Sequence, residues 1–131
     1  MPRRLPRILV IDDHKFTLDA VTDILMDEEC YDVYSYLFLP RLEFIRILNP
    51  DVILLDVILQ HSDGRHICQI LRNDPCFSQT QIVLFSAYLD SGSSVIEAGA
   101  NAFLRKPFDI DDLLCLISKC VSERMQKNSS A

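Results

Sequence analysis

Five polar side chains stand where short apolar segments end, and together they could form one chemical site. Asp12 and Asp13 follow the segment RILVI, and Asp56 follows DVILL. Ser86 follows QIVLF, and Lys106 follows AFLR. Ligands of open parallel sheets bind outside the carboxyl ends of the strands. If the apolar segments are parallel strands, the five side chains therefore converge.

Three carboxylates in one small site repel one another. At a separation of about 5 Å and an effective dielectric constant near 20, each pair costs roughly 3 kcal/mol. The single ammonium of Lys106 offsets only one carboxylate. A hard divalent cation would neutralise the rest, and an all-oxygen ligand set suits Mg²⁺ or Mn²⁺. We therefore expect Asp12, Asp13 and Asp56 to form a divalent metal site.

Such a site is suited to phosphoryl transfer. A carboxylate is a competent nucleophile toward phosphorus, and the transfer needs mainly positioning and neutralisation of the phosphoryl oxygens. The metal would bind one oxygen, Lys106 a second, and the Ser86 hydroxyl or a nearby backbone N–H a third. Asp56 is the candidate phosphoacceptor because it ends the central predicted strand, opposite the acidic pair. Each group alone has an ordinary explanation as a helix cap or turn residue, so the prediction rests on their combination.

The apolar segments themselves predict strands. Four of them are unbroken, as is typical of strands covered on both faces, and one mixed segment predicts an edge strand. The unbroken segments are Arg7–Ile11, Asp51–Leu55, Gln81–Phe85 and Ala102–Arg105, and the mixed one is Tyr31–Tyr36.

Helical patterns separate these segments. We expect helices over residues 14–28, from Pro40, after caps at Ser62 and Asp63, from near Ser93, and after Asp109. The second helix presents Leu42, Ile45 and Leu48 to the core, and the third carries Ile67, Ile70 and Leu71. The fourth is expected to be short, because the segment that begins at Tyr88 contains a run of serine and glycine. Strict alternation of strand and helix predicts an α/β fold, a doubly wound five-stranded parallel sheet.

Composition limits the class of protein further. The chain has 131 residues, of which 49% are hydrophobic, and we expect one domain over residues 7–124 with flexible termini at 1–6 and 125–131. The net charge of −6 argues against nucleic acid as a direct partner. The apolar runs are too short to span a bilayer, and no signal peptide is recognisable. We therefore expect a cytoplasmic protein without membrane contact.

Taken together, the motifs resemble the receiver domain of two-component response regulators, the CheY-like superfamily. The resemblance covers about residues 7–123. It rests on ILVIDD at 8–13, DVILLD at 51–56 with Gly64 eight residues later, Ser86-Ala87, and GANAFLRKPF at 99–108. It implies a flavodoxin-like (βα)5 fold with the strand order 2-1-3-4-5.

The resemblance also implies roles at the metal and phosphoryl site. Asp56 would accept a phosphoryl group from a sensor histidine kinase or a histidine phosphotransfer protein. Asp13, Asp56 and the backbone carbonyl of Ile58 would bind Mg²⁺ directly, and Asp12 would act mainly through water. Lys106 would hold a phosphoryl oxygen, next to a cis Lys106–Pro107 peptide. The domain would modify itself and would not turn over an external substrate.

Signal output is implied in the same way. Ser86 and the switch aromatic Phe103 would couple phosphorylation to the surface formed by the fourth helix, the fifth strand and the fifth helix. That surface serves in the family for dimerisation or for binding a target, so we expect a homodimer or an output partner there. Two departures from the family pattern concern geometry: Leu59-Gln60 replaces the usual Met-Pro, and Phe103 lacks the hydroxyl of the commoner Tyr.

Three alternatives remain open at this stage. A flavodoxin-like mononucleotide binder would need a Ser-, Thr- or Gly-rich loop after the first strand, where this chain has Asp12-Asp13-His14-Lys15. An aspartyl-phosphate phosphatase would need a second Asp two residues after the nucleophile, where this chain has Ile58. A degenerate receiver that works only as an interaction module would not need the full set of polar residues that this chain retains.

Overall fold

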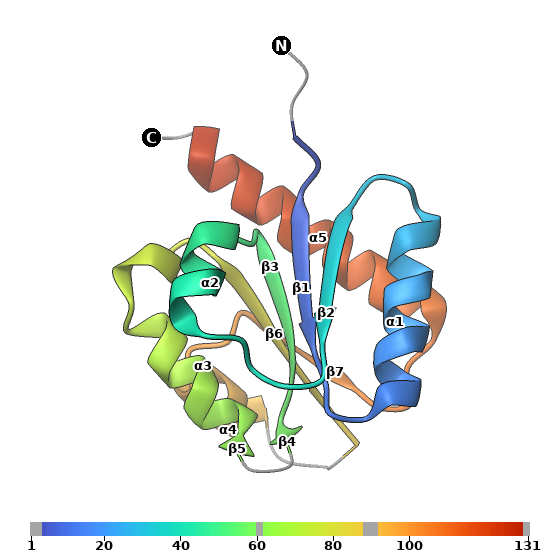
Figure 1. Cartoon of the computed structure of the whole chain (residues 1–131), viewed down its shortest axis with the longest axis horizontal. Helices are drawn as coiled ribbons and strands as arrows, with labels where there is room; N and C mark the ends of the chain where they lie inside the picture. The colour runs from blue at the N-terminus through green and yellow to red at the C-terminus, as the bar shows by residue number, and fades with distance from the viewer. Residues whose placement is uncertain (1–3, 60–61, 88–91, 130–131) are drawn as a thin grey trace.

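The computed structural model describes residues 4–59, 62–87 and 92–129, and its centre is a twisted parallel sheet of five strands (Figure 1). The strands are β1 (Arg7–Ile11), β2 (Asp32–Tyr36), β3 (Val52–Asp56), β6 (Gln81–Ser86) and β7 (Ala102–Arg105). Their order across the sheet is β2-β1-β3-β6-β7. Counted along these five strands, the order is 2-1-3-4-5, so the predicted doubly wound topology is confirmed.

Helices cover both faces of the sheet (Figure 1). One face carries α1 (Lys15–Asp27) and α5 (Ile110–Ser129), and the other carries α2 (Leu42–Leu48), α3 (Gly64–Arg72) and α4 (Gly92–Glu97). A 3₁₀ turn, η1 (Pro75–Phe77), follows α3. The six-residue α4 confirms the short fourth helix, although Tyr88 lies outside the described residues. Within the described part of the chain, no helix is both long and apolar enough to cross a membrane.

Burial follows the sequence pattern closely. Every residue of β3 and β6 is buried, whereas all five residues of β2 are half-buried. Three of the four unbroken apolar runs therefore form covered strands inside the sheet, and the mixed segment forms an edge strand, as predicted. The prediction is wrong for the fourth run, Ala102–Arg105, because β7 is the other edge strand and only Leu104 in it is buried. Alternate side chains of the central strands enter two separate cores, one under α1 and α5 and one under α2, α3 and α4.

Some local features differ from the prediction. Helix α2 begins at Leu42 rather than Pro40, because Arg41 has an extended backbone with ψ of 143°. Ile70 is 42% exposed, because it lies outside the arc of α3 that buries Ile67 and Leu71. An antiparallel pair that the sequence did not indicate, β4 (Ile58–Leu59) with β5 (Ser62–Asp63), follows β3.

The C-terminal helix is longer than expected. Helix α5 continues to Ser129, so the predicted domain end at residue 124 lies inside it. Arg124 is largely buried there, with its Nε 3.4 Å from Oδ1 of Asp51 at the amino end of β3. This ion pair links α5 to the sheet at a point beyond the last apolar residue expected in that helix. Flexibility of residues 1–6 and 125–131 remains a prediction, and residues 1–3 and 130–131 lie outside the described residues.

Candidate functional site

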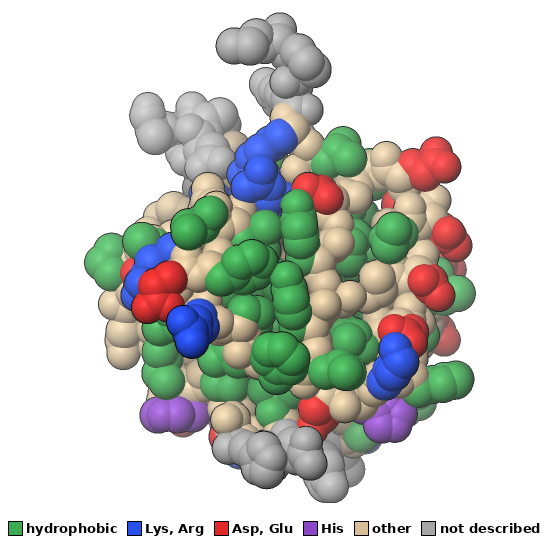
Figure 2. All heavy atoms as spheres, in the orientation of Figure 1, with side chains coloured by type: hydrophobic (Ala, Val, Ile, Leu, Met, Phe, Trp, Pro, Cys, Tyr) green, Lys and Arg blue, Asp and Glu red, His purple; other side chains and the backbone are tan. Residues whose placement is uncertain are grey.

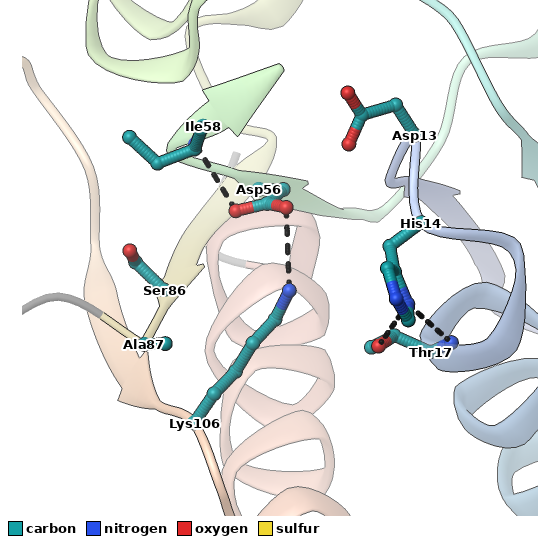
Figure 3. A pocket seen from close by; sticks show the side chains of 8 residues that line it. All are labelled: Asp13, His14, Thr17, Asp56, Ile58, Ser86, Ala87 and Lys106. Carbon is teal, nitrogen blue, oxygen red and sulfur yellow. Dashed lines mark hydrogen bonds and ion pairs between the residues drawn. The ribbon is translucent and has the colours of Figure 1, made fainter. Parts of the chain in front are cut away.

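The five polar side chains singled out in the sequence do converge at the carboxyl edge of the sheet. Asp56 ends β3 and Ser86 ends β6, while Asp12 and Asp13 follow β1 and Lys106 follows β7. A pocket of about 310 Å³ opens at this edge (Figure 3). Its lining residues are Asp13, His14, Thr17, Asp56, Ile58, Ser86, Ala87 and Lys106.

The three aspartates form one carboxylate cluster. Asp12, Asp13 and Asp56 each offer an oxygen within 4.8 Å of the oxygens of the other two. Asp12 is fully buried, Asp56 is 5% exposed, and Asp13 is half-buried. The predicted concentration of negative charge is therefore present, and water screens it only partly.

Lys106 supplies positive charge to two of the three carboxylates. Its Nζ lies 3.0 Å from Oδ2 of Asp12 and 3.2 Å from Oδ2 of Asp56. The backbone N–H of Lys106 donates to the carbonyl of Ser86 at 2.8 Å. This hydrogen bond holds the backbone that follows β7 against the end of β6. The Lys106–Pro107 peptide is cis, as the resemblance implied.

The two neighbouring aspartates differ in their surroundings. One oxygen of Asp12 accepts from the backbone N–H of His14 at 2.9 Å, and the other faces Lys106. Asp13 instead lines the pocket, and its carboxylate reaches in from the opposite side to Asp56 (Figure 3). Asp13 is consequently the better placed of the pair for direct contact with a bound cation.

Burial raises the pKa of Asp56 to about 6. The neighbouring charge of Asp12 contributes to this rise, whereas the Ile58 N–H, which donates to Oδ1 at 3.1 Å, and the Lys106 ammonium act to lower the pKa. The single ammonium of Lys106 faces three carboxylates, so it balances the charge of only one of them. The all-oxygen donor set and the remaining negative charge fit a hard divalent cation.

The two remaining predicted site residues, Ser86 and Phe103, differ in their place relative to the pocket. Ser86 is buried and lines the pocket beside Ala87. Phe103 pairs with Leu84 in the sheet and lies away from the pocket lining. It is half-buried and packs against the core under α2, α3 and α4, to which Val95 of α4 belongs. Phe103 thus contacts the layer that contains α4.

Sequence reasoning missed two residues of the pocket, His14 and Thr17. His14 caps α1, and its Nδ1 accepts from the backbone N–H of Thr17 at 3.4 Å and lies 3.1 Å from the Thr17 hydroxyl oxygen (Figure 3). Their only signal in the sequence was proximity to the acidic pair. The Leu59-Gln60 departure is described in part: Leu59 packs against the core, and Gln60 lies outside the described residues.

Comparison with known proteins agrees with this geometry. The family model of the response regulator receiver domain matches residues 8–118. The DNA-binding dual master transcriptional regulator RpaA of Synechocystis is 31% identical over 86% of this chain and 48% of its own length. The response regulator ArlR of Staphylococcus saprophyticus is 32% identical over 95% of this chain and 56% of its own length. The chain spans about half the length of these curated relatives.

A solved structure shows the same relationship. The CheY-like response regulator receiver domain protein of Methanospirillum hungatei superposes with a TM-score of 0.80 at 26% identity, covering 95% of this chain and 99% of that one. The family match covers most of the chain, and the fold and the acidic pocket are those that the resemblance implied. The chain therefore belongs to the response regulator receiver domain family of two-component signalling.

Proposed function

We propose that Asp56 is the phosphoacceptor of this receiver domain and that its phosphorylation depends on Mg²⁺. Phosphorylation on an aspartate is general to the family. The observation that carries the proposal is the carboxylate cluster, in which Lys106 reaches both Asp12 and Asp56. Asp56 is the member of the cluster at the end of the central strand, and it faces the pocket.

The residues that would hold the cation are those with oxygen donors at the pocket. In this proposal Asp13, Asp56 and the backbone carbonyl of Ile58 bind Mg²⁺ directly, and Asp12 acts through water. Mn²⁺ has similar ligand preferences and would substitute. When bound, the ion neutralises charge on the transferred phosphoryl oxygens.

The transfer itself makes and breaks one bond. A carboxylate oxygen of Asp56 forms a bond to phosphorus, while the bond from phosphorus to the donor breaks and the donor leaves with the electron pair. For a phosphohistidine donor the leaving group is an imidazole. Lys106 exchanges its contact with Asp56 for a phosphoryl oxygen, and the Ser86 hydroxyl donates to another.

The donor follows from the family, whose members interact with histidine kinases. We infer that a sensor histidine kinase or a histidine phosphotransfer protein phosphorylates this chain. Receiver domains do not turn over external substrates, and we propose that this chain catalyses only its own phosphorylation and dephosphorylation. We also infer a cytoplasmic location, where such kinases present their phosphohistidine.

Ser86 and Phe103 are the proposed route from the phosphoryl group to a partner. Phe103 contacts the layer that contains α4, so its position would respond to a shift of Ser86 and change the α4–β7–α5 surface. That surface would form a homodimer or bind an output partner. The relative RpaA is a DNA-binding transcriptional regulator. For this domain we propose no direct nucleic acid contact, because its net charge is −6.

Acetyl phosphate, a small-molecule phosphodonor, tests the proposal without a known kinase. The wild-type chain should gain one acid-stable but base-labile phosphoryl group with Mg²⁺ and none with a chelator. Asp56→Asn should gain none under either condition. Equal labelling with and without the chelator would contradict the metal dependence, and labelling of Asp56→Asn would contradict the site.

A further inference from the structure

A second surface of the molecule, formed by α2 and the end of β2, exposes large apolar side chains. Phe38 is 68% exposed, Phe44 is 40% exposed and Ile47 is 81% exposed. The Tyr36 ring joins them, since it packs edge-on against Phe38 and Phe44 with centroids 6.4 and 5.8 Å apart. We call Tyr36, Phe38, Phe44 and Ile47 the α2 surface. Figure 2 shows hydrophobic side chains gathered on this face, between α2 and β2.

The sequence of α2 explains why this surface is apolar. Ile45 and Leu48 are buried and Leu42 is partly buried against the core, as the helical period requires. Ile47 lies on the opposite side, where a surface helix normally carries polar residues, and Phe44 lies on the flank next to Leu48 and against Tyr36. Clustered exposed apolar groups of this kind mark interaction sites.

The charged residues of α2 indicate which partner covers the α2 surface. Glu43 and Arg46 are both exposed and lie one turn apart on the outer side of α2. Arg46 uses its Nε to bond Asp74 at 2.8 Å, and its guanidinium has further N–H donors for a second carboxylate. The outer side of α2 therefore carries an acid toward its amino end and a base toward its carboxyl end.

This arrangement is complementary to itself. If two copies of α2 pack antiparallel across a two-fold axis, Glu43 of one copy faces Arg46 of the other, and the same contact is made twice. Phe44 of each copy then lies within side-chain reach of Ile47 of the other, next to the ion pairs. Such a contact is an isologous interface, the commonest kind in homodimers.

We propose that the α2 surface is the interface of a two-fold homodimer of this chain. The interface differs from the α4–β7–α5 surface and does not depend on the phosphorylation of Asp56. Strand β2 lies at the edge of the sheet beside it, so the aromatic cluster around Tyr36 would be covered as well. The occupant is a second copy rather than an unrelated protein, because one patch supplies both halves of the charge pairing.

Sedimentation equilibrium of the unphosphorylated chain tests this proposal with a matched pair of variants. Ile47→Glu places a charge at the centre of the α2 surface, whereas Ile96→Glu changes an isoleucine of similar exposure, 74%, on α4. Ile47→Glu should raise the dimer dissociation constant by about tenfold or more, since it would bury an unpaired charge. Ile96→Glu should leave the constant unchanged. A wild-type chain that is monomeric up to its solubility limit would overturn the proposal, as would a dimer that only Ile96→Glu dissociates.

Charge reversal identifies the pairing. Glu43→Arg alone should weaken self-association, because it places arginine against arginine, and Arg46→Glu alone should do the same with two glutamates. Mixing the two variants should restore a one-to-one heterodimer, because position 43 of each chain then faces a residue of opposite charge at position 46 of the other. Circular dichroism checks that Arg46→Glu still folds without the Asp74 contact. Single variants that dimerise as the wild type does, or a mixture that remains monomeric, would overturn the two-fold pairing.

Discussion

The ammonium nitrogen of Lys106 lies 4.4 Å from the centre of the Phe85 ring. The ring is fully buried and is packed edge-on against Phe108 with centroids 6.4 Å apart. Its face therefore offers Lys106 a fixed support while the ammonium contacts Asp12 and Asp56. A cation over an aromatic face gains roughly 0.5–2 kcal/mol, and the gain is larger where water is excluded.

Phe85→Leu should slow phosphorylation by acetyl phosphate several-fold, because a loss of about 1 kcal/mol in the positioning of Lys106 corresponds to roughly fivefold in rate. Val83→Ala is the matched control, since Val83 is buried in the same core on the same strand. It should lower stability but leave the rate close to that of the wild type. Equal rates for Phe85→Leu and Val83→Ala would show that the ring serves only packing.

Asp56→Asn should stabilise the metal-free domain near neutral pH. The pKa of Asp56 is raised from 3.8 to about 6 on folding, chiefly by burial. The carboxyl's contribution to stability is therefore fully present below about pH 4 and is lost as the pH rises through about 6. Near pH 7 the neutral amide avoids this loss, and the free energy of unfolding should rise by about 1–3 kcal/mol.

Urea unfolding in the presence of a chelator measures this difference. The advantage of Asp56→Asn should shrink toward zero near about pH 4, where the aspartic acid is also neutral. Saturating Mg²⁺ should stabilise the wild type more than the variant. A variant less stable than the wild type near neutral pH without metal would contradict the cause given for the raised pKa.

Mg²⁺ affinity should depend more on Asp13 than on Asp12. Asp12 is already held by the His14 N–H and by Lys106, whereas Asp13 lines the open pocket. In calorimetric titrations, Asp13→Asn should therefore weaken Mg²⁺ binding more than Asp12→Asn does, since only Asp13 is expected to contact the ion directly. Equal losses would refute this assignment.

Gly64→Ala should damage the site through the backbone. A Cβ at Gly64 would overlap the carbonyl oxygen of Asp56 and lie 2.8 Å from the Cα of Val57, because the Gly64 N–H donates to the Val57 carbonyl at 2.7 Å. The substitution should lower the free energy of unfolding by about 1–3 kcal/mol and slow phosphorylation. Ser62→Ala, an exposed position in the same segment, should do neither, and a Gly64→Ala protein with wild-type stability would contradict the crowding.

The sheet and the convergence of the five polar side chains could be predicted from the sequence because both follow from the apolar strand segments. Fully covered strands such as β3 need unbroken apolar residues, and the topology then brings their polar ends together. Features set by three-dimensional packing were not predictable in this way. The β4–β5 pair depends on local backbone pairing of Ile58 with Asp63 and of Leu59 with Ser62 rather than on a hydrophobic period. The His14 side chain lines the pocket because it caps α1 by accepting a hydrogen bond from the Thr17 backbone N–H.

Position-specific chemical mapping tests the central claim most directly. The wild-type chain is incubated with acetyl phosphate and Mg²⁺ and then reduced with borohydride, which converts a phosphorylated aspartate to homoserine, and the product is digested and sequenced by mass spectrometry. The account predicts homoserine at position 56 alone, with none when Mg²⁺ is chelated. Homoserine at position 12 or 13, or at no position, would contradict it.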